Sequence, residues 1–340
     1  MNIRRNILPL MMVFLSLTSC LITDSVRSTR IEVLKPSIFG IPNDLTVALF
    51  KSDLLHLDTS NFKYSNGFEE LKDATINYQA ISDTCVNALA NYLIKEGYFR
   101  KVINYSDSFK YFSEFTGQTY KKDNLFEKAK SDVCIFLDRL NFDTFYISYS
   151  SVPFNTHAKL SWTVSIKNDS TKHCYKQTDT LVYYKSQVHR YKDKKTILKQ
   201  LINNSCEYLG QSFGTKVIPS WMQVDRMYYK SNNHHMLLAE KYALSNNWIK
   251  AAEIWNKETD NKNQWIAAKA CFNMALACEM EGKPEVGIDW LEKSSNQMFK
   301  NRVEHEINCR HYSEVLTNRI DEIVSLSHQV TNTEVNSLNE

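Results

Sequence analysis

The C-terminal part of the chain repeats at a fixed spacing, and this repeat limits its fold more than any other feature. The segment "LLAEKYALSNNWIKAAEIW" aligns with "MALACEMEGKPEVGIDWL" further along the chain. The members of each aligned pair are 36 positions apart: Ala239 and Ala275, Tyr242 and Cys278, Asn246 and Gly282, Ala251 and Gly287, Trp255 and Leu291. A period of this size predicts repeated helical hairpins. We expect Ala251 and Gly287 where two helices nearly touch, and Trp255 and Leu291 in the groove beside them.

The two hairpins resemble tetratricopeptide repeats, whose usual period is about 34 residues. About three repeats are normally needed for an independent solenoid, so we expect this pair to pack on the α/β domain that precedes it or on a C-terminal helix at 302–326. The predicted helical module therefore covers 229–326, and a polar tail follows at 327–340.

Residues 31–228 show alternating strand and helix patterns and predict a mixed α/β domain. The helix that starts at Ile76 has an apolar stripe of period 3.6 and ends at Gly97, a typical C-terminal cap. The first predicted elements are strands at 31–35 and 45–50, the helix from Ile76, a strand at 99–104, a helix at 121–130 and a buried strand in "SDVCIFLDRL".

After Leu140 the pattern changes to long alternating strands. In "HAKLSWTVSIK" apolar and polar residues alternate, which predicts a half-buried antiparallel strand. Together with 143–150 and 173–185 it predicts an antiparallel meander, followed by a helix at 194–213. The predicted fold class is α+β: a mixed α/β domain with a meander, then the helical module.

The N-terminus has the layout of a secretory signal, with Arg4 and Arg5 before a short apolar stretch. That stretch is shorter than the ~20 apolar residues of a membrane span. Leu17-Thr18-Ser19-Cys20 resembles a bacterial lipobox, in which the cysteine is acylated and becomes the first residue. We therefore expect a signal peptide at 1–19, a lipid on Cys20, a tether at 20–30 and attachment to a membrane surface.

Charge and cysteine content give little information about the function of the chain. Removal of residues 1–19 takes away two arginines and no acid, which lowers the formal charge from +3 to +1 and gives no reason to expect nucleic acid as a partner. Seven cysteines follow Cys20, an odd and scattered set that does not predict a disulfide framework. Cys271 and Cys278 are ~10 Å apart along one helix face, too far for a disulfide. We interpret them as packed core residues.

No catalytic residue, metal site or cofactor is predicted. His305, Cys309 and His311 are the best metal candidates, but one straight helix cannot turn all three to the same side. His234 and His235 are adjacent, so their side chains should diverge at the start of a repeat helix.

A second candidate is a dyad of Cys174 with one of three histidines, but Cys174 lies in an alternating strand pattern with no nucleophile turn. The three histidines are His157, His173 and His189. The chain also lacks G-x-S-x-G, H-E-x-x-H and glycine-rich phosphate motifs. Its many tyrosines and phenylalanines are compatible with a glycan cleft, but "YISYS" and "LVYYK" are typical of packed strands.

Several segments resemble an uncharacterised family of lipoproteins from Bacteroides-type bacteria with a single long domain of unknown function. They are the lipobox, "IEVLKPSIFGIPNDLTVALF", "SDVCIFLDRLNF" and "PSWMQVDRMYYKSNNHHMLLAEKYALSNNWIKAAEIW". The resemblance implies a lipid-anchored envelope protein with tetratricopeptide-like helices and transfers no catalytic residue. Residues 45–140 are also similar to the small α/β domain of lipoproteins that activate cell-wall synthases and of curli-secretion lipoproteins, at the level of the fold alone.

The sequence thus predicts a non-enzymatic protein in the bacterial cell envelope, on the outer membrane and facing the periplasm. Its expected partners are the membrane, through lipid at Cys20, and another envelope protein, bound by the helical repeats. The alternative is a hydrolase of cell-wall or glycan material, or a glycan-binding protein, with a site that the sequence does not identify.

Overall fold

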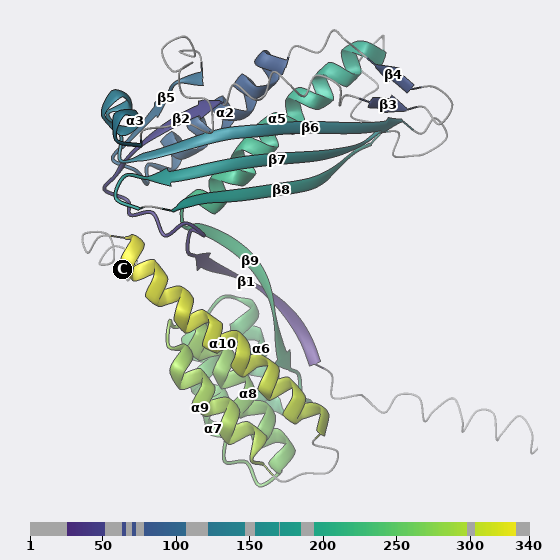
Figure 1. Ribbon diagram of the computed structural model, residues 1–340. Helices are drawn as coiled ribbons and strands as arrows, with labels where there is room; N and C mark the ends of the chain where they lie inside the picture. The colour runs from purple at the N-terminus through teal and green to yellow at the C-terminus, as the bar shows by residue number, and fades with distance from the viewer. Residues whose placement is uncertain are drawn as a thin grey trace, which may run out of the picture. The chain divides into compact units, whose positions relative to one another are not determined.

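The computed structural model describes residues 26–51, 63–65, 70–72, 78–106, 122–146, 154–169, 171–184, 194–297 and 303–330 (Figure 1). The chain divides into two compact units. The helical unit takes Met1–Leu34 and Trp221–Val324, and the α/β unit takes Lys35–Ser220 and Ser325–Glu340. The predicted signal peptide at 1–19 and Cys20 lie outside the described residues.

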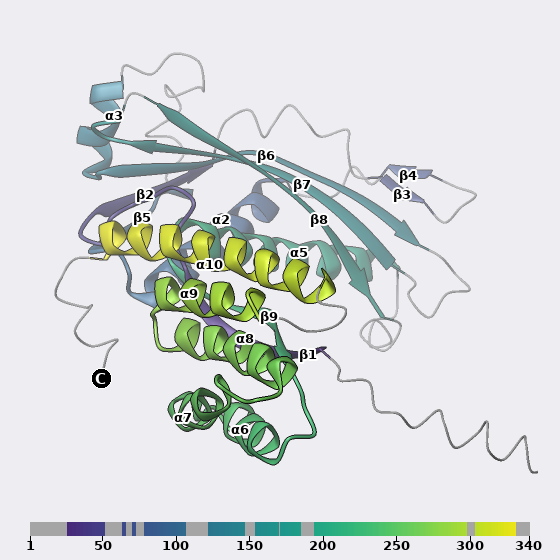
Figure 2. The ribbon, with the colours of Figure 1, turned by 90° about the horizontal axis from the view of Figure 1, so that it is seen from below.

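The α/β unit is built on one mixed sheet. Its elements are β2 (Thr46–Lys51), β3 (Lys63–Ser65), β4 (Glu70–Lys72), α2 (Tyr78–Glu96), β5 (Lys101–Asn104), α3 (Lys122–Ala129), β6 (Val133–Tyr146), β7 (Phe154–Ile166), β8 (Lys172–Tyr183) and α5 (Lys194–Val217). Strand β2 pairs in parallel with β5 on one side and β6 on the other. Strands β6, β7 and β8 form an antiparallel meander, seen as one long twisted layer in Figure 2. The short β3–β4 hairpin joins the far end of β6.

The main core lies between one face of this sheet and the helices α2 and α5. Every second residue of β7, from Ala158 to Val164, is buried, as the sequence alternation predicts. Trp162 stacks on Phe213 of α5 with ring centroids 4.3 Å apart. The helices themselves approach closely, because a Cβ on Gly210 of α5 would overlap the carbonyl oxygen of Cys85 on α2.

Helix α3 covers part of the opposite sheet face, where its apolar residues pack on Phe50 and Phe136. Apart from β3, β4 and β6, the predicted helices and strands of this unit are confirmed from β2 to α5. Gly97 follows α2 with the positive φ of 64° that its predicted capping role requires.

One prediction in this unit is wrong, and two short strands were not predicted. The strand in "SDVCIFLDRL" and residues 143–146 of the strand predicted at 143–150 form the single strand β6, whose pairing shifts between Leu137 and Arg139. Residues 147–150 of that prediction lie outside the described residues. A bulge lets one strand continue where its apolar alternation is interrupted. The polar stretch at 51–75, for which no strand was predicted, contains β3 and β4.

The helical unit combines a two-stranded ribbon with five helices. The elements are β1 (Val26–Lys35), β9 (Ser220–Tyr229), α6 (His234–Leu244), α7 (Trp248–Glu258), α8 (Gln264–Met280), α9 (Pro284–Ser295) and α10 (Val303–Gln329). Strand β1 pairs with β9, and Ile31 and Val33 of β1 share one core with the helices. None of the helices in the described ranges has the length and apolar character needed to cross a membrane.

Three predicted boundaries differ from the structure. Strand β1 begins at Val26, inside the predicted tether at 20–30. The strand predicted at 31–35 does not open the α/β domain, because it is part of β1 and packs with the helices through Ile31 and Val33. Helix α10 runs to Gln329, into the predicted tail at 327–340, and Gln329 is 3% exposed.

Candidate functional site

The helical unit contains the residues that the repeat singled out. Helices α6 and α7 form one hairpin and α8 and α9 a second, and each of the first three helices begins with an asparagine whose side chain accepts backbone N–H bonds. Helix α9 instead begins with Pro284, whose fixed φ suits the first helical position. Of the predicted packing residues, Ala239, Ala251, Trp255, Ala275, Gly287 and Leu291 are buried, and Tyr242 and Cys278 are half-buried.

Gly287 marks the closest helix approach in this unit. A Cβ at this position would lie 2.8 Å from Leu316 Cδ1 on α10 and 3.2 Å from the carbonyl oxygen of Ala275 on α8. Helix α9 therefore lies between α8 and α10, as Figure 2 also shows. Only a residue without a side chain allows both contacts.

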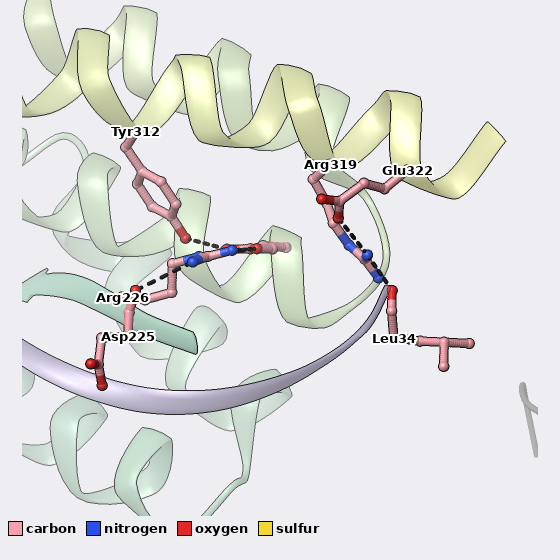
Figure 3. Close-up of polar contacts among 7 residues, drawn as sticks. Leu34, Asp225, Arg226, Tyr312, Arg319 and Glu322 are labelled. Atoms are coloured by element: carbon pink, nitrogen blue, oxygen red, sulfur yellow. Dashed lines mark hydrogen bonds and ion pairs between the residues drawn. The ribbon is translucent and has the colours of Figure 1, made fainter. Parts of the chain in front are cut away.

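A buried ion pair joins the ribbon to the helices. Arg226 of β9 donates to both carboxylate oxygens of Glu279 on α8, at 2.8 Å from Nε and 2.7 Å from Nη2 (Figure 3). Tyr312 of α10 donates to the same carboxylate at 2.8 Å. The Glu279 side chain is only 1% exposed, so this paired geometry offsets the cost of removing the charge from water. Burial and the neighbouring Glu279 raise the pKa of Tyr312.

A second set of polar contacts, about two turns along α10 from Tyr312, also holds the ribbon. Arg319 donates to the carbonyl oxygen of Leu34 at 2.6 Å and to Glu322 at 3.0 Å (Figure 3). Backbone of β9 is bound further along, because the Asn273 amide of α8 pairs with both the N–H and the C=O of Tyr229. The ribbon is thus fixed to α8 and α10 by polar contacts as well as by packing.

His305 lies at the centre of a buried polar network. Its Nε2 is 2.9 Å from Ser294 Oγ and 3.4 Å from Cys309 Sγ. Its Nδ1 is 3.0 Å from the Tyr229 hydroxyl. His305 is 2% exposed, and burial, with a smaller effect of Lys269, lowers its pKa to about 4. The imidazole is therefore neutral at pH 7.

The predicted metal candidates do not come together. His305 and Cys309 are in contact, but His311 is exposed on another side of α10. In the part of the chain that the structure describes, no three metal-ligating side chains form a cluster. His234 and His235 begin α6, as predicted, and His235 pairs with the buried Glu258 of α7 at 2.5 Å.

The residues of the proposed Cys–His dyad are also separate. His173 bonds to Asp169 at 2.9 Å, whereas Cys174 is exposed on the other face of β8, 3.6 Å from Thr163 Oγ1. His157 contacts Thr180 at 2.9 Å, and His189 lies outside the described residues. All seven cysteines after Cys20 are free, and Cys271 and Cys278 are buried and half-buried.

The aromatic segments are only partly described. In "LVYYK" the Tyr183 hydroxyl lies 3.2 Å from the Leu201 carbonyl oxygen, to which it can donate, and 2.7 Å from Ser205 Oγ. Both partners are on α5, so Tyr183 packs against that helix. Tyr184 is exposed, and the side chains of "YISYS" lie outside the described residues.

An open groove of about 890 Å³ runs between α9 and α10. It is lined by Ile288, Leu291, Glu292, Ser295, Asn296, Val303, Glu306, Ile307, Cys309, Arg310 and Ser313. Val303 and Ile307 are one turn apart on α10 and are 67% and 49% exposed. We call this feature the α9–α10 groove. Sequence reasoning gave Leu291 and Cys309 other roles and missed the rest, although the spacing of Val303, Ile307 and Arg310 is typical of one helix face.

Two family profiles match the chain. Residues 48–229 match a family described as Domain of unknown function (DUF8603), and residues 238–318 match Domain of unknown function (DUF6340). The first match runs from β2 to the end of β9, and the second covers most of α6 to α10. The expected single long domain is therefore two. No curated protein matches the chain significantly.

Proposed function

Because the chain belongs to the family described as Domain of unknown function (DUF8603), a description that names no activity, we propose a function from its own residues. The protein binds a partner protein in the α9–α10 groove and is held at an envelope membrane by lipid on Cys20. The observation that carries the proposal is the pair Val303 and Ile307, large apolar side chains left 67% and 49% exposed beside a groove. Apolar patches of this kind mark sites of protein interaction.

The shape and chemistry of the groove favour an amphipathic helix as the bound segment. Both walls are helices whose lining residues recur every three or four positions, so the apolar strip follows the helix axes. A helical ligand would place its own residues at the same spacing along the strip, as in other helix-in-groove complexes. Glu292, Glu306 and Arg310 give the groove a charged rim for orientation.

The two helical hairpins, α6–α7 and α8–α9, support the interpretation of the helical unit as a tetratricopeptide-like module. Helix α9 begins 36 positions after α7, the same offset as the sequence repeat, and α10 packs on the second hairpin as a terminal helix. A repeat module of this kind is a scaffold that presents helix grooves to other proteins. The lipobox at Cys20 supports a location in the envelope of a bacterium. The proposed compartment is the outer membrane, with the fold in the periplasm.

A hydrolase is the competing proposal, and the contact between Cys309 and His305 beside the groove is the observation in its favour. The protonation states argue against it. A nucleophilic cysteine needs a lowered pKa, but burial raises the pKa of Cys309 to about 11. The pKa of His305 is lowered to about 4, so the pair is a thiol and a neutral imidazole rather than a thiolate and an imidazolium.

Photo-crosslinking in membranes of the native cell tests the binding proposal. A photoreactive amino acid at Ile307 should crosslink to one partner protein, and the same amino acid at Ile249 of α7, which is 60% exposed outside the groove, should not. The double variant Val303→Asp, Ile307→Asp should lose partner recovery, whereas Val286→Asp, Ile249→Asp should retain it. Equal recovery of the partner protein with both double variants would show that the α9–α10 groove does not bind it.

The anchor is tested in the same cells. The Cys20→Ser variant should not incorporate a fatty-acid analogue and should leave the membrane fraction. Acyl labelling that persists in this variant would show that Cys20 is not the attachment point.

A further inference from the structure

The meander exposes a sheet face that differs in character from the groove. Helices α2 and α5 pack on one face of β6, β7 and β8, behind the strands in Figure 1. On the other face α3 packs near Cys134 and Phe136. Beyond Phe136, this second face carries mainly polar and charged side chains, and no described helix packs on them.

Three exposed cations occupy adjacent register positions on this face. Arg139 of β6 pairs with Ser161 of β7, which pairs with Lys176 of β8, so the three residues form a row across the meander. In the next row Lys159 of β7 pairs with Thr178 of β8. From the usual strand spacing and rise, the Cα atoms of the three cations form a triangle with sides of roughly 8 to 10 Å. We call it the cationic triangle.

The positive charge of the triangle is available to a ligand. Arg139, Lys159 and Lys176 are exposed, and within the described ranges none of them forms an ion pair. Asp138, the residue before Arg139, accepts a hydrogen bond from Thr163 at 2.5 Å. Burial raises the pKa of Asp138, against the opposing effects of Thr163, Lys172 and Arg139. Residues 35–220 as a whole contain 24 Lys and Arg and 19 Asp and Glu, a formal net charge of +5.

The spacing decides what kind of anion fits. Among the described residues no contact draws the three cationic head groups together, so a ligand that presents several negative charges over ~10 Å matches them better than one phosphate or carboxylate, which spans only a few ångströms. The face is an exposed sheet surface without apolar anchors between the cations, which suits another extended surface. Hydroxyls of Ser161 and Thr178 beside the cations add hydrogen-bond donors for phosphate oxygens.

We propose that the cationic triangle binds the headgroups of an anionic lipid bilayer. A basic surface is a second membrane signal that acts together with a lipid chain, and each basic residue near an anionic membrane raises binding about fivefold. The inference depends on neither acylation of Cys20 nor the α9–α10 groove, because the charge of the triangle acts without a lipid on the chain.

Vesicle co-sedimentation tests this with the chain from residue 21 onward, which carries no lipid. At low salt it should bind vesicles of equal phosphatidylglycerol and phosphatidylcholine and should not bind phosphatidylcholine alone. The triple variant Arg139→Gln, Lys159→Gln, Lys176→Gln should bind about a hundredfold more weakly. The matched control is Lys95→Gln, Lys101→Gln, Lys199→Gln, which removes the same charge from exposed positions on α2, β5 and α5. The control should stay within about twofold of the unchanged chain.

Three results would overturn the proposal. An equal loss in the control would mean that total charge, and not the triangle, attracts the vesicles. Absence of binding to the anionic vesicles would remove the lipid surface as a ligand. Binding of soluble polyglutamate through the triangle, without binding to the vesicles, would assign the face to an acidic polymer instead.

Discussion

The buried imidazole of His305 makes the stability of the helical unit depend on pH. Its folded pKa of about 4 is below the ordinary value of 6.5, so the unfolded chain binds the proton first as the pH falls. The stabilising contribution is complete above the ordinary value and is lost progressively as the pH falls towards the folded one. Between pH 7 and pH 5 this should remove about 2 kcal/mol of unfolding free energy.

The variant His305→Gln isolates this effect. It should be less stable than the unchanged protein at pH 7, because a buried network loses its central member, and the difference should shrink by about 2 kcal/mol at pH 5. Urea unfolding at the two pH values measures it, and His311→Gln, an exposed histidine on the same helix, is the matched control. If the unfolding free energies of the unchanged protein and His305→Gln change equally with pH, His305 is not the group that makes stability depend on pH.

At the residue scale, sequence reasoning predicted which positions are small and packed but not the polar networks. The cap at Gly97 and the small side chains at Ala251 and Gly287 follow from local periodicity. Arg226 and Glu279 are 53 positions apart and Tyr229 and His305 are 76 apart. No local pattern links such pairs, because the contact exists only once β9 has packed on α8 and α10.

At the level of helices, the close contacts at Gly287 and Ala251 allow a test of the packing register that the sequence repeat predicts. A leucine at Gly287 must displace Leu316 or the Ala275 backbone, and a leucine at Ala251 enters a fully buried position. Overpacking of this kind costs about 1–3 kcal/mol, so Gly287→Leu and Ala251→Leu should both lower the melting temperature of the helical unit. Lys250→Leu, next to Ala251 but exposed, should have little effect. Equal melting temperatures for Ala251→Leu and Lys250→Leu would mean that the packing register is wrong.

The strands show that sequence alternation can identify a strand but cannot identify its pairing partners. Strong alternation identified β7 and β8, because half-buried strands repeat every two residues. The same reasoning divided β6 into two strands, since Asp138 and Arg139 interrupt the apolar pattern at the bulge, and it assigned β1 to the wrong unit. Which strand pairs with which is a long-range property, and β1 finds its partner β9 at the far end of the α/β unit's sequence.

At the scale of the whole molecule, the α/β unit is inserted within the sequence of the helical unit. The chain enters the α/β unit at Lys35, leaves it after Ser220 and returns to it at Ser325, in the last turns of α10. Domain limits at 228 and 326 were predicted from changes of pattern along the sequence. That approach cannot detect a β1 strand or a helix end that groups with residues hundreds of positions away.

The end of α10 is therefore predicted to stabilise the α/β unit. The Gln329 amide donates to the Ser37 carbonyl oxygen at 3.2 Å and accepts from the Ser37 N–H at 2.8 Å. The Gln329 carbonyl oxygen accepts from the Tyr98 hydroxyl at 2.8 Å and from the Asn43 N–H at 3.2 Å. Removal of residue 329 leaves several buried groups without these bonds, at a cost of about 1–3 kcal/mol each before water replaces the lost partner.

Two truncations measure this contribution. A chain that ends at Val324 should lose amide hydrogen-exchange protection in the adjoining segment 37–49 and in α2, whereas a chain that ends at Val330 keeps all four bonds and should match the full chain. Gln329→Ala in the full chain is the point variant: it removes the two side-chain bonds and should give an intermediate loss, because the bonds to the backbone carbonyl remain. If the chain that ends at Val324 keeps full protection in these segments, the last turn of α10 contributes nothing to the α/β unit, and the grouping of its C-terminal residues with that unit is wrong.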